Sequence, residues 1–251
     1  MFSSGNVPRY SAEEVLCGRL DQIISLKVST HAGAHHFCQI ARMPGLGQKY
    51  GPGLVVGYGQ GHEASFLKQC LRVTIIGVDL YPPACDFCDQ DFAPVLANAL
   101  NLPFREETFE FVFCHHVIEH VADPRTILIE IKRVLRPGGW LYIGTPNRHR
   151  IVGYIGSYKV TFRQKILWNL RDYADRLRGQ FTNEMGAHAG FSQQELEDLL
   201  RKSGFSTIHW LTKEYLWFKY GHRWPRWVLR VVTSPAVIQF AAPSLYVLCE
   251  K

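Results

Sequence analysis

A short apolar run at residues 53–56 breaks into a glycine-rich turn, with glycine at positions 57, 59 and 61. Because glycine has no Cβ, backbone N–H groups in such a turn can approach a ligand closely. The next apolar run, residues 73–78, ends on Asp79. An acid at this distance can accept hydrogen bonds from both hydroxyls of a ribose. The two features together predict an α/β fold that binds a ligand where its first strand ends.

The spacing of the glycines bears on which ligand this is. The dinucleotide fingerprint G-x-G-x-x-G would place its third glycine at position 62, where this chain has His62. A nicotinamide-dependent oxidoreductase is therefore disfavoured, and only measured binding of a nicotinamide cofactor would restore it. The glycine loop alone is a weak signal, so the class of ligand has to be inferred from the rest of the chain.

Short apolar strands alternate with helical patterns from residue 53 to residue 147. This alternation is typical of βαβ units and of a mostly parallel sheet. In the helix before the fifth strand, Asp123 can act as the N-cap and Pro124 suits the first turn. We expect Pro137-Gly138-Gly139 to end that helix. The strands are expected at residues 53–57, 73–79, 94–98, 110–115 and 139–145.

The alternation stops at residues 148–187, where basic residues outnumber acidic ones and aromatic residues are interleaved. We interpret this segment as a helical insertion over the ligand edge of the sheet, and as a candidate cap on a substrate pocket. Regular structure resumes at Ser192, whose hydroxyl can pair with Glu195 in a capping box. Strands near 206–212 and 245–250 would complete the sheet.

The rest of the chain reads as part of the same domain. Residues 1–50 are expected to form an N-terminal helical segment, because Ser11 and Glu14 have the spacing of a capping box. The whole chain, 1–251, is interpreted as a single domain. Near its end, residues 224–230 mix tryptophan with arginine. This mixture suits a membrane interface, although packing between the last two strands is favoured, so peripheral membrane contact stays open.

Composition narrows the class of protein. Of 251 residues, 47% are hydrophobic and 20% are charged, which is enough apolar material for a sizeable core. The net charge of +6 suits an acidic small molecule or an anionic surface without requiring nucleic acid. Seven scattered cysteines indicate reduced thiols. The N-terminus lacks a signal pattern, and no apolar stretch reaches the roughly 20 residues that span a bilayer. We therefore expect a cytoplasmic protein.

Five short blocks follow one another in order between residues 53 and 147. They are the Gly57-x-Gly59-x-Gly61 loop; Asp79; Asn98-Ala99 with Leu102-Pro103-Phe104; Phe109-Glu110-Phe111-Val112 running into Val117-Ile118-Glu119-His120-Val121; and Arg133-Val134-Leu135-Arg136-Pro137-Gly138-Gly139. Thr145-Pro146-Asn147 comes next. In this order and spacing, the stretch resembles the core of a class I S-adenosylmethionine-dependent methyltransferase of the type 11 group.

The resemblance implies a Rossmann-like, doubly wound sheet of seven strands with an antiparallel last strand, and S-adenosyl-L-methionine as cofactor. It implies that Gly57, Gly59 and Gly61 contact the methionine part of the cofactor and that Asp79 holds the ribose. It also implies that Asn98 and Ala99 meet the adenine, and that Cys114 and His115 line the sulfonium end. One position departs from the family pattern, because Val55 stands where an acid is usual; Glu63 is a candidate to compensate.

Methyl transfer is a displacement at a methyl carbon, so the protein mainly has to align the reactants and exclude water. A general base is required when the acceptor is a hydroxyl or another protonated group. The candidates are His115, His116 and His188, since imidazole titrates near neutral pH. We expect a small-molecule or lipid-linked acceptor, with O-methylation slightly favoured over methylation at carbon or nitrogen.

Other interpretations were weighed against this one. The departure at Val55 motivates a non-catalytic binding or scaffold protein that retains the fold. The Asn/Asp-Pro-Pro-aromatic tetrapeptide of amino-group DNA methylases is absent after the fourth strand, which disfavours a nucleic-acid substrate. No metal site is predicted. The loosely spaced His31, His35, His36 and Cys38 lack firm ligand spacing, and Cys85 and Cys88 are interpreted as unpaired thiols.

Overall fold

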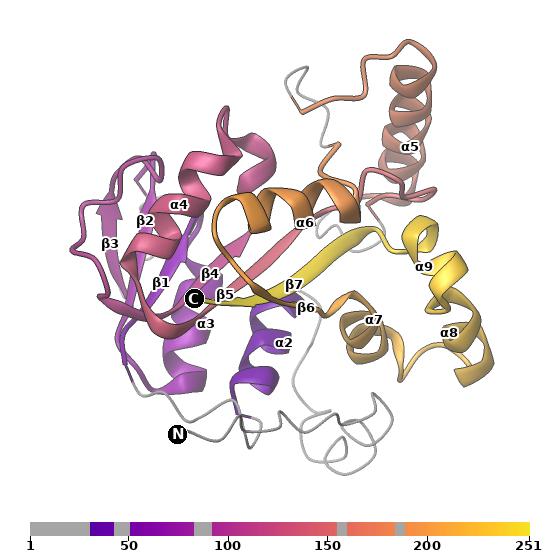
Figure 1. Cartoon of the computed structure of the whole chain (residues 1–251). Helices are drawn as coiled ribbons and strands as arrows, with labels where there is room; N and C mark the ends of the chain where they lie inside the picture. Colours follow the sequence, from indigo (N-terminus) through magenta and orange to yellow (C-terminus); the bar gives the residue numbers. More distant parts are fainter. Residues whose placement is uncertain (1–30, 43–50, 83–91, 155–159, 184–188) are drawn as a thin grey trace.

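A seven-stranded sheet with strand order β3-β2-β1-β4-β5-β7-β6 organises the molecule (Figure 1). The computed structural model describes residues 31–42, 51–82, 92–154, 160–183 and 189–251. Strands β1 to β5 pair in parallel, whereas β7 runs antiparallel to both β5 and β6. The predicted fold class, a doubly wound and mostly parallel sheet with an antiparallel last strand, is confirmed. The strands are β1 (Gly53–Val56), β2 (Ile75–Asp79), β3 (Ala93–Leu96), β4 (Phe109–His115), β5 (Leu135–Pro146), β6 (Thr207–Trp210) and β7 (Ser244–Glu250).

Helices cover both faces of the sheet and create two apolar cores. One core lies between the sheet and α4 and α6, and the other lies between the sheet and α2, α3 and α7. The helices are α2 (Ala32–Ala41), α3 (His62–Leu71), α4 (Pro124–Val134), α5 (Phe162–Leu177), α6 (Gln193–Lys202), α7 (Thr212–Tyr220), α8 (Arg226–Val232) and α9 (Pro235–Ala241), with a 3₁₀ turn η2 (Ile118–His120). Two-sided cover explains why β1 and β4 are apolar along almost their whole length.

The sequence order of the strands reverses direction between β1 and β4. From β1 the chain moves outward to β2 and β3, and it then crosses back to β4 on the other side of β1. In open α/β sheets, ligands bind beyond the carboxyl ends of the strands at such a switch point. The loops after β1, β2 and β4 are therefore where a site is expected.

Two helix starts follow the predicted capping chemistry. The Asp123 side chain accepts hydrogen bonds from the N–H groups of Arg125 and Thr126, with Pro124 in the first turn of α4. At α6, Ser192 and Glu195 form a reciprocal capping box. The capping box predicted at Ser11 and Glu14 lies outside the described residues.

The end of α4 differs from the prediction. The helix ends at Val134, before Pro137-Gly138-Gly139, because Leu135 is already extended and pairs with Phe109 of β4. The ladder resumes with Trp140 beside Phe111. The Pro-Gly-Gly segment therefore forms an irregularity inside β5 instead of the helix stop.

The insertion is helical, as predicted, and contains α5. The segment between β6 and β7 folds into α7, α8 and α9, so the tryptophan- and arginine-rich residues 224–230 lie between the last two strands of the chain. In the described part of the chain, no helix combines the length and the apolar character needed to cross a bilayer.

Candidate functional site

The glycine loop leaves the carboxyl end of β1 with a backbone that favours glycine. Gly57, Gly59 and Gly61 have φ values of 73°, 51° and 80°, all in the left-handed region. A Cβ on Gly57 would lie 2.2 Å from a Val117 methyl carbon, so this position is also closed by contact. A Cβ on Gly59 would meet nothing within 4 Å. The backbone at Gly59 is therefore open on one side.

Asp79, at the carboxyl end of β2, is bonded to that open backbone. Its Oδ2 accepts a hydrogen bond from the Gly59 N–H at 2.8 Å, and its Oδ1 accepts one from the Tyr81 N–H at 3.2 Å. Tyr58 turns inward from the loop, packs against Phe92, and donates its hydroxyl to the Tyr81 carbonyl at 3.0 Å. The loop and the acid are braced together. A carboxylate has about four acceptor positions, so Asp79 retains capacity for further donors.

Asn98 and Ala99 follow β3 on the same edge of the sheet. β3 pairs with β2 so that Leu96 lies beside Asp79, and Asn98 comes two residues later. The Asn98 side chain is exposed, and its Oδ1 accepts the Leu100 N–H at 3.0 Å, which fixes the local turn. The structure thus brings the Gly59, Asp79 and Asn98 positions to one edge.

His115, the last residue of β4, forms an ion pair with Glu63 in the first turn of α3. Its Nδ1 lies 3.0 Å from Glu63 Oε1, and the two side chains are only 14% and 25% exposed. Burial lowers the pKa of His115, but the charge and hydrogen bond of Glu63 outweigh that effect, so the pKa is raised from 6.5. Burial opposes ionisation of Glu63 as well, and the neighbouring histidines still lower its pKa from 4.5. Both directions favour a charged pair.

The other ring nitrogen of His115, Nε2, is buried and has no hydrogen-bond partner among the described residues. The ring lies against Gly33 of α2 and Gly144 of β5, where an added Cβ would come within 2.8 Å and 2.4 Å of it, respectively. Glycine at these two positions makes room for the imidazole. A buried polar atom without a partner is uncommon in native proteins, which marks this edge as a place built for something other than packing.

His116 forms a second acid–histidine pair directly beside the first. Its Nδ1 lies 3.1 Å from Glu119 Oε1, while Glu119 Oε2 accepts the Thr145 hydroxyl at 3.0 Å. His116 has a φ of 56°, a conformation that side chains other than glycine rarely adopt. Its ring centroid is 4.4 Å from that of His115. The His116 side chain is 43% exposed, in contrast to Glu119, which is 1% exposed.

The two histidines have opposite pKa shifts. Although part of the His116 ring is exposed, the surrounding protein and the adjacent His115 charge lower its pKa from 6.5, against the opposing effect of Glu119. As pH rises, His116 therefore loses its proton before His115, and the pKa of His116 below 6.5 favours its neutral form at neutral pH.

Cys114 and His188 are the two other predicted site residues. Cys114 is fully buried in the core on the α4 side of the sheet, so its thiol faces away from His115. Burial raises the pKa of that thiol, and Cys114 can reach a ligand only through its backbone. His188 lies outside the described residues.

Val55 is buried in the core between the sheet and α2, α3 and α7. Glu63, the candidate to compensate for the missing acid, is paired with His115 instead. The expectation that Glu63 replaces the usual acid stays a prediction.

His36 of the N-terminal region belongs to the packed core. His36 is buried and its Nδ1 lies 3.0 Å from the Tyr142 hydroxyl, and burial lowers the pKa of His36 to about 3. Within the residues that the structure describes, there is no group of three or more His, Cys, Asp or Glu that could hold a metal ion. Cys85 and Cys88 lie outside those residues.

Sequence reasoning missed both acid–histidine pairs as pairs. His116 and Glu119 are three residues apart, a spacing that could have been noticed. Glu63 and His115 are 52 residues apart, and the fold joins them by bringing the first turn of α3 to the carboxyl end of β4. No local pattern announces such a contact.

Comparison with known proteins supplies the family. Residues 54–143 match the family model described as a methyltransferase domain, of the type 11 group. These residues run from the first strand to the fifth and include the glycine loop, Asp79 and both histidine pairs. Residues 54–143 form a class I methyltransferase domain of the type 11 group.

Curated relatives resemble the methyltransferase domain over part of their own length. A ubiquinone biosynthesis O-methyltransferase from Thiobacillus denitrificans is 29% identical over 108 residues, covering 43% of this chain and 44% of the relative. A demethylmenaquinone methyltransferase from Anoxybacillus flavithermus is 27% identical over 114 residues, covering 45% and 48%. The chain spans about half the length of the curated relatives it matches.

Solved structures share the fold over more of the chain. A structure from Thermotoga maritima, described as an S-adenosylmethionine-dependent methyltransferase and possible histamine N-methyltransferase, aligns with a TM-score of 0.51 at 20% identity. The alignment covers 88% of this chain and 89% of that one. At this identity the likeness establishes the fold and leaves the acceptor undefined.

Proposed function

We propose that the methyltransferase domain binds S-adenosyl-L-methionine and transfers its methyl group to a small-molecule or lipid-linked acceptor, with O-methylation favoured. The observation that carries the proposal is the Asp79 carboxylate, bonded to the open backbone at Gly59 on the switch-point edge. The named relatives in quinone biosynthesis are consistent with a small-molecule acceptor.

The residues on this edge fit the proposed cofactor. S-adenosylmethionine supplies a methyl group carried on a positively charged sulfur. Asp79 has the acceptor capacity for ribose hydroxyls, and Asn98 offers an amide near the same edge. The N-terminus of α3, which follows Gly61, presents the positive end of a helix dipole to a carboxylate. Gly59 keeps the backbone accessible.

His116 is the proposed general base. Glu119 holds its Nδ1, which leaves Nε2 to accept a proton from an acceptor hydroxyl. A general base has to be neutral before it accepts a proton. The positive charge of His115 favours the neutral form of His116, because the centroids of the two rings are 4.4 Å apart. Two titratable groups with pKa values pushed apart are a common arrangement for acid and base roles.

Calorimetric titration with S-adenosylmethionine and with its demethylated product tests the cofactor. The protein is expected to bind both, and Asp79→Ala is expected to weaken binding severely because the ribose loses its carboxylate partner. Asp198→Ala is the matched control, since Asp198 is exposed on α6 and accepts a hydrogen bond from Gln194. Unchanged affinity in Asp79→Ala would remove the site assignment.

A pH profile of methyl transfer tests the base. The acceptor is found first, by incubating the protein with methyl-labelled cofactor and fractionated cell extract. The rate is expected to rise with pH along a limb whose midpoint lies below pH 6.5, because the pKa of His116 is lowered from that value. His116→Gln is expected to lower the rate by about 10²- to 10⁴-fold, with His209→Gln, exposed on β6, as control.

The variant Glu63→Gln uses the same pH profile to test whether the two histidines are coupled. Without the Glu63 charge, burial lowers the pKa of His115, and this residue loses its proton at a lower pH than in the parent. The pKa of His116 then rises, since the His115 charge lowers it more than Glu63 itself raises it. The rising limb should move to higher pH; an unmoved limb would exclude coupling between the two histidines.

A non-catalytic protein that retains the fold is the second candidate, and buried Val55 is the observation that favours it. It predicts cofactor binding without label transfer to any extract fraction. Label in one fraction, lost in His116→Gln, would decide for the enzyme.

A further inference from the structure

Helix α5 presents its apolar side to solvent. Of its 16 residues only Asp172 is buried. The exposed apolar side chains are spaced about one or two helical turns apart, as expected for one helix face. They include Leu177 at 91% exposed, Phe162 at 77%, Leu167 at 62% and Leu170 at 59%. A contiguous apolar surface of this kind is unusual on a soluble domain and marks a binding surface.

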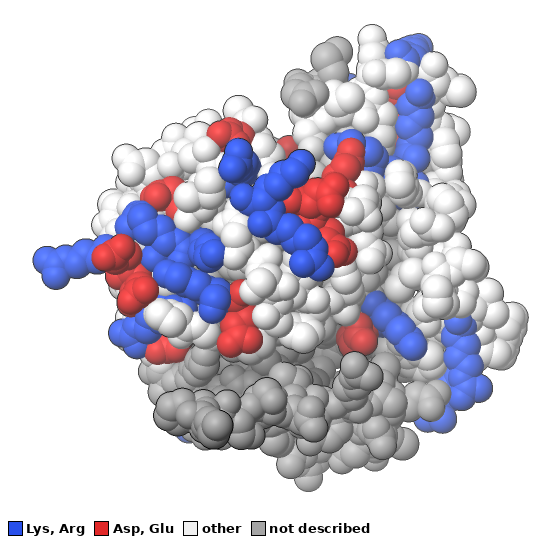
Figure 2. Space-filling view, in the orientation of Figure 1, with Lys and Arg blue, Asp and Glu red and all other residues white. Residues whose placement is uncertain are grey.

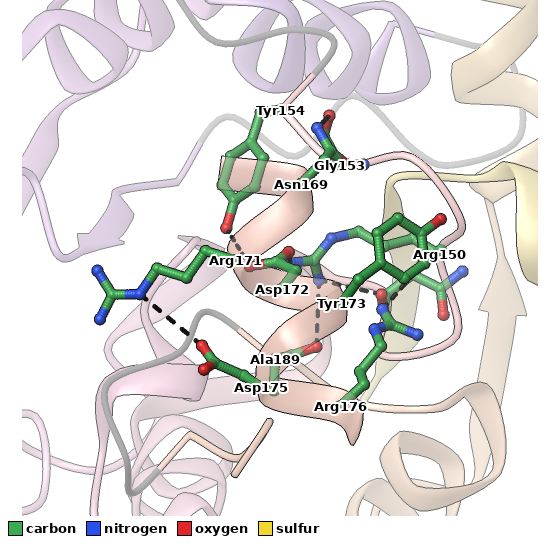
Figure 3. Close-up of polar contacts among 12 residues, drawn as sticks. Arg150, Gly153, Tyr154, Asn169, Arg171, Asp172, Tyr173, Asp175, Arg176 and Ala189 are labelled. Carbon is green, nitrogen blue, oxygen red and sulfur yellow. Dashed lines mark hydrogen bonds and ion pairs between the residues drawn. The ribbon is translucent and has the colours of Figure 1, made fainter. Parts of the chain in front are cut away.

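Polar contacts on the opposite side of α5 fix this orientation (Figure 3). Asp172 accepts hydrogen bonds from Arg150 at 2.8 Å and from the Tyr154 hydroxyl at 2.9 Å. Arg150 is only 3% exposed. Asn169 bonds to both the N–H and the carbonyl of Gly153, and Arg176 donates to the Arg150 carbonyl at 2.9 Å. Because these polar groups form their hydrogen bonds on the inner side of α5, the apolar side of the helix faces solvent.

The apolar surface continues from α5 toward α9 and α8. The Tyr173 hydroxyl of α5 donates to the Ile151 carbonyl, and the Ile151 N–H donates to the Phe240 carbonyl of α9 at 2.8 Å. Figure 1 shows α5, α9 and α8 one after another along one side of the molecule. The exposed apolar residues beyond α5 are Ile151, Val152, Trp227, Val231 and Phe240. Together with those of α5 they form what we call the basic apolar face.

Charge on this face is positive. Arg163, Arg171 and Arg178 are exposed at α5, and Arg226 and Arg230 are exposed on α8. The acids of α5 are Asp172, which is buried beside Arg150, and Asp175, which lies 3.8 Å from Arg171. The sequences of α8 and α9 contain no acid. Lys and Arg side chains appear over α5 and toward α8 among mostly uncharged surface (Figure 2).

We propose that the basic apolar face binds the surface of an anionic lipid bilayer. Exposed aromatic and aliphatic side chains flanked by arginine are the features of helices that lie in a membrane interface. Pairing of two copies through the same face would bring arginine against arginine, so charge favours lipid over self-association. The inference goes beyond methyl transfer and requires neither cofactor nor acceptor.

Vesicle co-sedimentation of the full chain tests the proposal. The protein is expected to bind phosphatidylcholine vesicles that contain roughly one third phosphatidylglycerol, and to bind pure phosphatidylcholine much more weakly. The double variant Leu167→Glu, Leu170→Glu should bind the anionic vesicles at least about tenfold more weakly. Ile129→Glu is the matched control, because Ile129 is an exposed apolar residue on α4, 45% exposed, and this variant should bind as the parent does.

The charge component is tested separately. Arg163→Gln and Arg171→Gln should each weaken binding about fivefold, and added salt should weaken binding by the parent chain. Equal binding to neutral and anionic vesicles, or unchanged binding by the double Leu variant, would overturn the proposal. So would sedimentation velocity showing a dimer that the double Leu variant dissociates, since the face would then be occupied by a second copy.

Discussion

Helices α4 and α5 have similar amphipathic sequences and opposite orientations. In α4, Ile127, Leu128, Ile131 and Val134 are all fully buried against the sheet, and the polar side faces solvent. In α5, the buried residue is Asp172, and the leucines face outward. An amphipathic pattern therefore identifies a face of a helix without saying whether that face meets the core.

What distinguishes the two helices is the partner available to the polar side. The polar side of α4 has no buried charge to satisfy, whereas α5 lies against Arg150, which is buried and already donates to the carbonyls of Asn147 and Ala189. Leaving a guanidinium buried without a carboxylate costs more free energy than leaving a leucine exposed, because an unpaired buried charge costs several kcal/mol. Asp172 supplies that carboxylate, and its position turns the whole helix.

The largest expected effect is the loss of that carboxylate. Asp172→Ala leaves Arg150 buried without its counter-charge, and we expect the free energy of unfolding to fall by about 3–5 kcal/mol. Urea denaturation measures the change. Asp175→Ala is the control: its partner Arg171 is 82% exposed, so a loss of at most about 1 kcal/mol is expected. Equal losses in the two variants would show that Asp172 does not set the orientation of α5.

Truncating one apolar residue in each helix comes next. Ile131→Ala opens a cavity in the core between the sheet, α4 and α6, and should lower the free energy of unfolding by about 2–5 kcal/mol. Leu167→Ala removes an exposed side chain and should change it by no more than about 0.5 kcal/mol. Thermal or urea unfolding of the two variants decides the matter. A large loss in Leu167→Ala would mean that the exposed side of α5 is covered in solution.

The features of the fold that were predictable are those with local causes. The glycine loop needs residues with φ above zero, Asp123 and Ser192 cap helices through adjacent N–H groups, and the alternation of strands and helices is visible along the chain. The end of α4 was predicted wrongly, because Leu135 is captured by the neighbouring β4 strand. That pairing with Phe109 overrides the local helix-stop signal of Pro137-Gly138-Gly139.

The candidate site divides in the same way. Asp79 was predictable from its place after a strand, and the structure bonds it to Gly59. The pairing of Glu63 with His115 was not, because two residues distant in sequence meet only when the fold brings the first turn of α3 to the carboxyl end of β4. Nor was the orientation of the Cys114 thiol. Adjacent residues of a strand face opposite sides of a sheet, so Cys114 enters the core on the α4 side and His115 lies on the side of α2 and α3.

The smallest expected effect compares two capping boxes with the same chemistry. Ser192 caps α6 and Thr161 caps α5, each with a reciprocal bond from the third helical residue. Ser192→Ala should lower the free energy of global unfolding by about 1 kcal/mol, since Leu196 and Leu200 of α6 are in the core.

Thr161→Ala removes an equivalent bond from a helix that contributes one buried residue. Its loss should therefore speed amide hydrogen exchange at the start of α5 while global unfolding stays within about 0.5 kcal/mol of the parent. A loss of global stability as large as that of Ser192→Ala would mean that α5 unfolds together with the core. The two helices would then differ in which side chains they bury, and not in how strongly they are coupled to global unfolding.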